Sequence, residues 1–417
     1  MIAQQAVGSE QLARWVMQEV GLLWSALREA ESGESTEEAV VAWSRRVGRR
    51  VLELGIQARL EEVEGQAERE CSCGGRQQVH SRQPRTGLTA LGAVRVQRRY
   101  LRCPRCGTGR RPADGWLGWK HGFSRRVEEA VAWSAAALPY RPALEGLRRF
   151  CGIELSLSAA QEIVARCGEK RLELDPYAER VSGRLGVEID GAMAHIDGDW
   201  HEVKLGSFFA WRAGKAETIS YVADWLTSDQ FRTPLWEEAV IRGAPKARKV
   251  AVLADGAAWI WETSGLLFPG ATEILDWYHA CEHLWEAGRV IHGEGKPETQ
   301  ALVQHWKGDL YQGYSEGLEQ ELRELAAAKR DPEETLRKTA DYLNRHQARL
   351  RYPHFRQAGW PIGSGIAEGG VKHVIDLRFK RKSARWKSPG FRSVLHLRLD
   401  ILNSRWEERW DSLRKAP

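Results

Sequence analysis

Apolar residues recur at three- and four-residue spacing through residues 9–70, first in EQLARWVMQEVGLLWSALREA and again in EEAVVAWSRRVGRRVLELGIQARLEEV. This spacing is the period of an amphipathic helix. The SGESTEE between the two runs is a polar break, and Ser35 and Glu38 stand in it at the spacing of a capping box for the second helix. Residues 1–70 are therefore predicted to form a helical hairpin that serves assembly or DNA binding.

The next 110 residues or so combine a strand pattern with a return to helix. LGAVRVQRRYLRC alternates apolar and polar residues between two pairs of cysteines, which predicts a small module over residues 71–123. Residues 124–180 are predicted to be mainly helical. Within them, LEGLRRFCGIELSLSAAQEIVARCG has the pattern of a helix, a short turn and a second helix, which fits either a DNA-binding helix-turn-helix or two ordinary packed helices.

Residues 181–417 alternate strands with helices. GVEIDGAMAHI, HEVKLGSFFAWRAG and ETISYVADW are strand-like, a helical stretch follows near 228–243, and RKVAVLADGAAW and ATEILDWYHA each contain a strand that ends in an acid. This order predicts an α/β domain with a mixed sheet flanked by helices. A long polar helical stretch at about 290–355 predicts a helical insertion ahead of the last segment.

Composition narrows the class of protein. No run approaches the roughly 18 apolar residues of a membrane span, and the first residues lack the layout of a signal peptide. Seven cysteines, an odd number in 417 residues, do not suggest a disulfide framework. We therefore expect a soluble, cytoplasmic protein without a membrane partner.

Positive charge is concentrated in two places although the net charge is only +6. Residues 76–112 contain ten Arg and no Lys, Asp or Glu, and residues 372–387 contain seven Lys or Arg and one acid. Either patch alone fits a solvated basic face, but two patches favour binding to the phosphates of double-stranded DNA. The candidate contacts are Arg95, Arg98, Arg99, Arg102 and Arg105 in the first patch and Lys372, Arg378, Lys380, Arg381, Lys382 and Arg385 in the second.

Two acids stand at corresponding places in the predicted sheet. Asp190 ends VEID and Asp255 ends VAVLAD, and a glycine follows each. Each Asp-Gly alone fits a simple turn. On adjacent strands, however, the two carboxylates would lie a few Å apart and repel each other unless a cation sat between them.

A third acid, Glu368, follows the Gly-Ser-Gly turn in PIGSGIAEGG at the start of a predicted helix. Three carboxylates form a set of hard oxygen ligands that suits Mg²⁺ or Mn²⁺. Two such ions about 4 Å apart would activate an attacking oxygen and stabilise the leaving one. The predicted chemistry is phosphodiester hydrolysis and attack by a 3′-hydroxyl.

Four stretches, VEIDGA, VLADGAAW, ILDWYHACEHLW and PIGSGIAEGGVKHVIDLRFKRKSARW, resemble the conserved blocks of the ISKra-type transposases of bacterial insertion sequences. The resemblance covers roughly residues 65–410. It implies a ribonuclease H-like catalytic fold, with Asp190, Asp255 and Glu368 as the catalytic DDE ligands of two metal ions. It also implies cleavage at element ends, strand transfer into target DNA, association with the nucleoid, and assembly at least as a dimer.

One departure from the family pattern leaves an alternative open. Gly369 stands where the family's late block usually has a serine, while Gly365, Glu368 and Lys372 match. A catalytically silent, transposase-derived protein that only binds DNA therefore remains an alternative.

Further residues near the acids have more than one interpretation. In the resembled family, Asp276 and His279 belong to an aspartate-x-x-histidine signature in which the histidine positions a phosphate or a flipped base; packing is the alternative for His279. His279, Glu282 and His283 also match the H-x-x-E-H pattern of inverted zinc proteases, a remote alternative.

Two tryptophans, Trp259 and Trp386, stand near the acids and in the basic run, where they are candidates to stack on unpaired bases, with core packing as the alternative.

The cysteines of the small module are spaced as two pairs. Cys71-x-Cys73 and Cys103-x-x-Cys106 offer four thiolates, enough for a closed tetrahedral zinc site. The first pair is one residue short of the usual knuckle, so four reduced thiols that bind nothing remain an alternative. With the arginine run around it, residues 71–123 are predicted to be a zinc-ribbon-like DNA-binding module.

Overall fold

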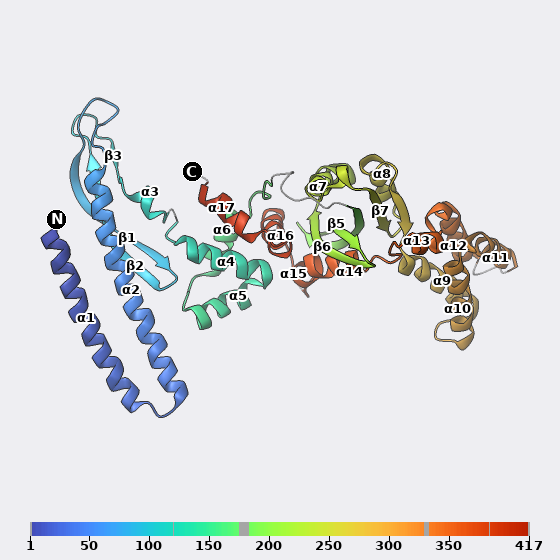
Figure 1. Cartoon of the computed structure of the whole chain (residues 1–417), viewed down its shortest axis with the longest axis horizontal. Helices are drawn as coiled ribbons and strands as arrows, with labels where there is room; N and C mark the ends of the chain where they lie inside the picture. The colour runs from blue at the N-terminus through green and yellow to red at the C-terminus, as the bar shows by residue number, and fades with distance from the viewer. Residues whose placement is uncertain (1, 120, 175–182, 329–332, 383, 416–417) are drawn as a thin grey trace. The chain divides into compact units, whose positions relative to one another are not determined.

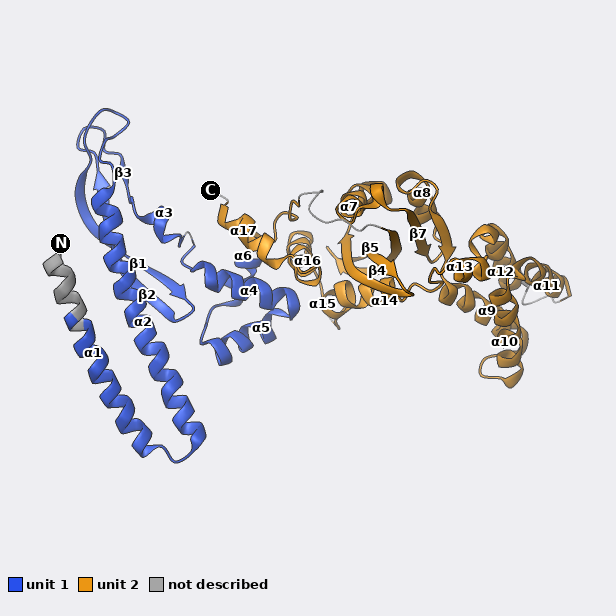
Figure 2. Cartoon of the chain, in the orientation of Figure 1, with its two compact units in different colours: residues 1–164 blue, residues 165–417 orange. Residues whose placement is uncertain are grey.

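The computed structural model describes residues 2–119, 121–174, 183–328, 333–382 and 384–415 (Figure 1). The chain divides into two compact units, residues 1–164 and 165–417 (Figure 2). The division falls within α6 (Leu157–Cys167), ahead of the predicted domain boundary at 180/181.

Unit 1 begins with two long helices, α1 (Ile2–Glu29) and α2 (Gly33–Gln66), which an ion pair of 2.8 Å between Arg46 and Glu19 joins. The hairpin predicted over residues 1–70 is present.

The start of α2 differs from the prediction. Ser32 is the N-cap; its hydroxyl accepts a hydrogen bond from the Ser35 amide, and the Ser35 hydroxyl accepts one from the Ser32 amide. The predicted capping box of Ser35 and Glu38 is wrong, because the pair of serines already satisfies the first free amides one turn earlier.

A β-hairpin packs on α2. β1 (Gln78–Thr89) and β2 (Gly92–Arg102) are antiparallel, and β3 (Gly109–Arg110) adds a short third strand. β2 lies where the alternating pattern predicts a strand, but β1 has a polar sequence that conceals it. A small core joins the hairpin, α2 and the region of α3 (Asp114–Leu117); it consists of Leu60, Val94, Val96, Ala113 and Trp119.

Helices follow the hairpin over the stretch where the sequence predicts them. They are α4 (Arg125–Ala137), α5 (Tyr140–Gly146), a π-helical turn (Leu147–Cys151) and α6. A helix-turn-helix role for α5 and α6 stays a prediction, and residues 175–180 of this predicted segment lie outside the described residues.

The sheet of unit 2 has the order β6-β5-β4-β7-β8. The first three strands in the chain form an antiparallel meander, and the last two run parallel to β4. The mixed sheet that the sequence predicts is therefore confirmed. Its strands are β4 (Arg184–Ile196), β5 (Asp199–Arg212), β6 (Lys215–Asp224), β7 (Lys249–Ala254) and β8 (Thr272–Leu275).

Helices α7 (Ser228–Ile241) and α8 (Ala258–Leu267) connect β6 to β7 and β7 to β8. Their apolar residues share one core with the sheet, in which Phe231, Leu253 and Ile274 are fully buried. Because each connection between parallel strands crosses over the sheet, the strand ends that precede α8 and the next helix meet at one edge.

The predicted insertion is helical and belongs to the same core. Trp306, Leu343 and Tyr352 are fully buried in the cluster that contains the strands β4, β7 and β8. Its helices are α9 (Trp277–His292), α10 (Pro297–Gln312), α11 (Ser315–Ala328), α12 (Glu333–Arg345) and α13 (Tyr352–Gln357). The insertion therefore packs as part of unit 2 and shares the core of its sheet.

After the insertion the chain returns to the sheet. α14 (Gly365–Gly370) packs on β4 and β5, where a Cβ on Gly370 would lie 2.8 Å from the Tyr221 ring. Only glycine permits this close approach. A π-helical turn (Val371–Asp376), α15 (Leu377–Phe379), α16 (Ser388–Leu402) and α17 (Trp406–Lys415) complete the chain.

Candidate active site and metal centre

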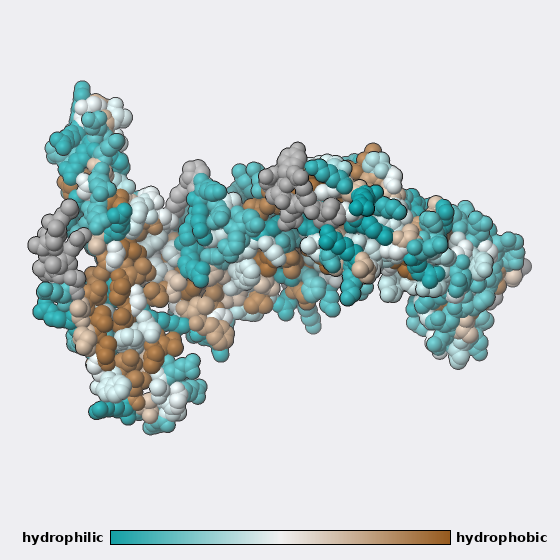
Figure 3. All heavy atoms as spheres, viewed as in Figure 1, coloured by the Kyte–Doolittle hydropathy of each residue, from teal (hydrophilic) through white to brown (hydrophobic). Residues whose placement is uncertain are grey.

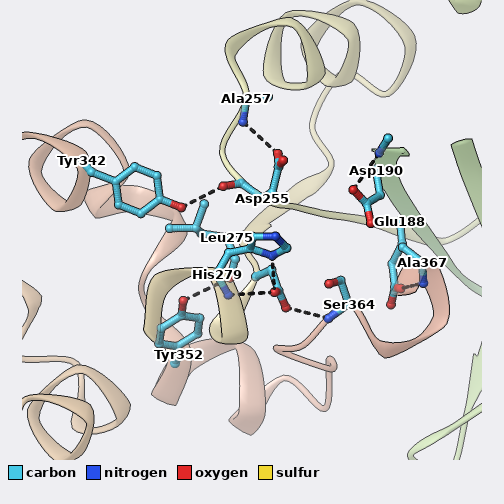
Figure 4. Close-up of polar contacts among 12 residues, drawn as sticks. Glu188, Asp190, Asp255, Ala257, Leu275, His279, Tyr342, Tyr352, Ser364 and Ala367 are labelled. Carbon is cyan, nitrogen blue, oxygen red and sulfur yellow. Dashed lines mark hydrogen bonds and ion pairs between the residues drawn. The ribbon is translucent and has the colours of Figure 1, made fainter. Parts of the chain in front are cut away.

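Three aspartates stand at one edge of the sheet, where the parallel pairing of its strands ends. Asp190, Asp255 and Asp276 each follow the last paired position of the neighbouring parallel strands β4, β7 and β8. Figure 4 labels Asp190 and Asp255. The expectation that Asp190 ends its strand is wrong, because β4 continues to Ile196 along β5; only its pairing with β7 ends there.

The two predicted metal-binding aspartates are partly held by the backbone. Asp190 accepts a hydrogen bond of 2.7 Å from the amide of Gly191, and Asp255 accepts one of 3.0 Å from the amide of Ala257. Burial and the nearby charges of Asp255 and Asp276 raise the pKa of Asp190. Negative charge is thus gathered where few solvent molecules can screen it.

Asp276 is buried and links the start of α9 to the segment before α14. Its carboxylate accepts hydrogen bonds from the His279 amide (3.0 Å), from His279 Nδ1 (2.8 Å) and from the Ser364 amide (2.7 Å). Burial raises the pKa of Asp276, but these hydrogen bonds outweigh it and the net shift is downward. The Asp276 side chain therefore caps α9 and fixes the turn that leads into α14.

His279 carries a positive charge at this edge. Its hydrogen bond with Asp276 is the main reason that its pKa is raised to about 9. The imidazole is consequently protonated at neutral pH, and its side chain is partly exposed beside the acids.

Glu188, which the sequence analysis did not single out, anchors α14 to β4. It lies two residues before Asp190, so alternation along the strand places both side chains on the same face. Its Oε2 accepts a 2.6 Å hydrogen bond from the Ala367 amide, and burial, the largest cause, raises the pKa of Glu188 to about 8. The polar residue at an otherwise apolar position of VEID was the signal that could have identified it.

Glu368 follows Ala367 but its side chain is exposed. It lines a hollow in the surface together with Lys372, His373 and Asp376. The carboxylate oxygens of Asp190, Asp255 and Glu368 do not all lie within 4.8 Å of one another. The structure therefore places Asp190 and Asp255 just beyond the parallel pairing of β4 with β7. It places Glu368 on α14, the helix that Glu188 joins to β4.

Two tyrosines of the insertion hold the strand ends. The hydroxyl of Tyr342 donates to the carbonyl oxygen of Asp255 (2.8 Å), and that of Tyr352 donates to the carbonyl oxygen of Leu275 (3.1 Å). Gly256 has a φ of +104°, and a Cβ there would lie 3.0 Å from the Tyr342 ring. The glycine after Asp255 is therefore required both for its conformation and for the approach of Tyr342.

The zinc-protease interpretation finds no support. His279 Nδ1 is bonded to Asp276, and the His283 ring packs on Tyr342 at 4.0 Å between centroids. Over the residues that the structure describes, no group of three ligand atoms within 4.8 Å includes His279 or His283.

The four predicted zinc ligands form a cluster. The sulfur atoms of Cys71 and Cys106 are 3.5 Å apart, those of Cys73 and Cys103 are 3.6 Å apart, and all four lie within 4.8 Å of one another. In a tetrahedral site with Zn–S bonds of about 2.3 Å the sulfurs would be about 3.8 Å apart. The cluster therefore has the ligand type, number and spacing of a structural metal site.

Two glycines explain how the short Cys71-x-Cys73 pair can form such a knuckle. Gly74 has a φ of +77° and its amide donates to the Cys71 carbonyl oxygen (2.8 Å). A Cβ on Gly75 would lie 2.9 Å from the Cys103 sulfur. The sharp turn at Gly74 and the missing side chain at Gly75 let Cys71 and Cys73 both reach the cluster although one residue, and not the usual two, separates them.

The first basic patch divides into buried and exposed arginines. Arg98 is buried and paired with Asp114, so its predicted contact with DNA is wrong: its guanidinium stabilises the module from within. Arg99 lies 3.5 Å from Glu64, and Arg105 donates to the Cys73 carbonyl oxygen at 3.0 Å. The exposed residues Arg95 and Arg102 remain candidates for phosphate contacts, and Arg105 is exposed as well.

The second basic patch divides in the same way. Arg378 is buried, with its guanidinium 4.7 Å from the Trp386 ring centre, so the prediction that Arg378 contacts DNA is also wrong. The candidate contacts of this patch that are exposed are Lys372, Lys380, Arg381, Lys382 and Arg385.

The two candidate stacking tryptophans are packed. Trp386 bonds through its backbone to His195 and Asp197 and packs on the Phe379 ring at 5.0 Å. Trp259 lies against Phe231 and under the Lys204 ammonium, 5.1 Å from its ring centre. Core packing, the alternative interpretation, is the one these contacts favour for both.

Comparisons with known proteins add little. No family model and no curated protein matches the chain. Among solved structures, the crystal structure of NurA bound to dAMP and manganese is similar at 13% identity over 66% of this chain, with a TM-score of 0.12. The matched region spans 62% of the NurA chain, and a likeness this low supports no conclusion. In the described part of the chain, no helix is long and apolar enough to cross a membrane.

Proposed function

We propose that this chain is a DNA transposase of an insertion sequence that cleaves and joins DNA with divalent metal ions bound at Asp190, Asp255 and Glu368. The observation that carries the proposal is the pair of aspartates that follows the last position of the parallel pairing between β4 and β7, next to a helix that bears an exposed glutamate. An antiparallel meander followed by two parallel strands supports the ribonuclease H-like fold that the sequence resemblance implies.

The residues present fit Mg²⁺ or Mn²⁺. Both aspartates offer hard oxygen ligands, and burial together with the nearby charge of Asp255 raises the pKa of Asp190, an effect that a bound cation would offset. The Glu368 side chain is exposed, and in this proposal it turns toward the two aspartates to complete the set of ligands. Ions bound there would supply activation of the attacking oxygen and stabilisation of the leaving oxygen.

The chain's other groups position these ligands and the DNA. Glu188 and Asp276 hold the two ends of the segment that leads into α14, through the amides of Ala367 and Ser364. The protonated His279 suits a phosphate near the acids.

DNA binding is assigned to the exposed basic residues. In unit 2 these are the lysines and arginines of residues 372–385, and in unit 1 they surround the cysteine cluster, for which zinc is the fitting metal.

The test is cleavage of a duplex taken from the DNA that flanks the coding sequence, with full-length protein and Mg²⁺. Asp190→Asn, Asp255→Asn and Glu368→Gln should each lower the rate by about 100-fold or more, because each removes a charge that binds the metal. Asp229→Asn, an exposed acid of α7, is the control and should keep the wild-type rate. Divalent-dependent cleavage that persists in both aspartate variants would refute the proposal.

The exposed Glu368 side chain favours one second candidate, a catalytically silent DNA-binding derivative. Such a protein would bind the flanking DNA equally well in Mg²⁺ and in EDTA and would never cut it. Cleavage by the wild type therefore separates the two candidates directly.

A further inference from the structure

Helix α1 has more apolar surface than α2 covers. In its described part, residues 10 and 12–29, Glu19 is the one buried residue. Met17 is 69% exposed, Trp24 is 60% exposed, and Leu22 and Val20 are exposed as well. A helix of this composition normally buries one face in a core, so the exposed face is unpartnered.

The exposed residues follow a helical seam. Ala13, Met17, Val20 and Trp24 are spaced by four, three and four residues, the repeat that lets helices pack side by side. On α2, three valines are exposed too: Val40, Val41 and Val51. Figure 3 shows apolar side chains gathered along the hairpin of α1 and α2.

The size of this face matches a protein interface. Helices of 28 and 34 residues are about 42 and 51 Å long, and a pair is about 20 Å wide. One face of the hairpin therefore offers roughly 800 Å² or more, which is about what each partner contributes to a stable interface.

The net charge of the hairpin restricts the class of partner that can bind it. Residues 1–66 contain eleven Glu, seven Arg and no Lys or Asp, a net charge of −4. A surface of this sign repels nucleic acid and anionic membranes. The charges of α2 are grouped, with four arginines at residues 45–50 between glutamates at 34–38 and at 53, so a second hairpin of the same sequence can pair its arginines with the glutamates of the first.

We propose that the exposed face of α1 and α2 packs against the same face of a second copy of this chain and forms a four-helix interface. With a two-fold axis, the same patch of each copy forms one side of the interface, so the apolar seams of both copies are buried against each other. The inference stands on the hairpin alone and does not depend on the proposed function.

Sedimentation equilibrium of the full-length protein tests this directly. The wild type should be a dimer, and the double variant Met17→Glu/Trp24→Glu should raise the dimer dissociation constant by about 100-fold or more, since charges would be buried in the seam. The matched control is Gln18→Glu/Ser25→Glu, which changes exposed polar residues of the same turns and should leave the dimer intact.

A second measurement keeps the test independent of folding defects. Two wild-type copies with different tags, expressed together, should purify as one complex, while circular dichroism should report equal helix content in both double variants. A monomeric wild type, or a dimer that the Met17/Trp24 variant retains, would overturn the proposal.

Discussion

Asp255 is held in position by a tyrosine that lies 87 residues further along the chain. The Tyr342 hydroxyl bonds to the Asp255 carbonyl oxygen, and its ring lies against Gly256. The position of a carboxylate that we propose as a metal ligand therefore depends on a tyrosine from the insertion. Single residues in this chain act in pairs of this kind: Glu188 with Ala367, and Asp276 with Ser364.

Replacing Tyr342 with phenylalanine should weaken the site without unfolding it. Loss of the hydroxyl leaves a partly buried carbonyl unsatisfied, at about 1–3 kcal/mol, and loosens Asp255. We expect the Mg²⁺ concentration for half-maximal cleavage to rise about tenfold, with a smaller change in the rate at saturating Mg²⁺.

A titration of cleavage rate against Mg²⁺ measures this effect. Tyr314→Phe, at an exposed tyrosine of the same insertion, is the control and should follow the wild-type curve. An unchanged Mg²⁺ requirement in Tyr342→Phe would show that the bond to Asp255 does not position it.

At the scale of elements, Gly74, Gly75 and the β-hairpin bring four cysteines into one cluster although the spacing of the first pair is unusually short. Cys71 and Cys73 come before β1, whereas Cys103 and Cys106 follow β2. The antiparallel pairing of β1 with β2 returns the chain to its start, and so the two cysteine pairs meet. The spacing within each cysteine pair does not reveal that the two pairs meet. That depends on the pairing of β1 with β2, and β1 has no clear apolar alternation by which to predict it.

The cluster should bind one zinc ion per chain. Cys103→Ser should lose it, and Gly75→Ala should raise the zinc dissociation constant about tenfold or more, because a Cβ would lie 2.9 Å from the Cys103 sulfur. Metal content by mass spectrometry and competition with a chelator measure both effects.

Cys151→Ser supplies the matched control, since Cys151 is an exposed cysteine outside the cluster. It should keep a full complement of zinc. Equal zinc content in Cys103→Ser and the wild type would remove the cluster from consideration as a metal centre.

At the scale of the whole molecule, the insertion and the sheet stabilise each other through a common core. His346 lies at this junction, 1% exposed, with its Nε2 unbonded among the described residues and its Nδ1 3.3 Å from Arg349. Burial, and then the charges of Arg349 and Arg345, lower the pKa of His346 to about 4. The folded chain therefore keeps this imidazole neutral.

Stability should consequently fall on acidification. An unfolded histidine takes up its proton near pH 6.5 and the folded one near pH 4, so unfolding binds a proton in this window. The free energy of unfolding of residues 165–417 should decrease by up to roughly 3 kcal/mol between these pH values.

The measurement is urea unfolding of the full chain as a function of pH, for the wild type and for His346→Asn. The asparagine keeps an acceptor for Arg349 but cannot titrate. The difference between the two should be constant above pH 7 and should shift in favour of the variant below pH 6.5. Parallel curves down to pH 4 would contradict the prediction.

Local periodicity was enough to place the helices of the N-terminal hairpin, the succession of strands and helices along the mixed sheet's part of the chain, and the helical insertion. The sequence also singled out the four cysteines by their spacing, and the pair Asp190 and Asp255 because each follows an apolar run and precedes a glycine. These features depend on residues close together in the chain or on a repeated period, and a sequence contains both.

Tertiary structure alone decided which charged groups face inward. Arg98 and Arg378 look like their exposed neighbours in the sequence, but both are buried, Arg98 in an ion pair with Asp114 and Arg378 beside the Trp386 ring. Glu188 is buried and accepts a hydrogen bond from the amide of Ala367, 179 positions further along the chain. Glu368, the next residue after Ala367, is exposed. The physical reason is that burial and hydrogen bonding depend on which distant segment packs against a residue, and no local pattern specifies that segment.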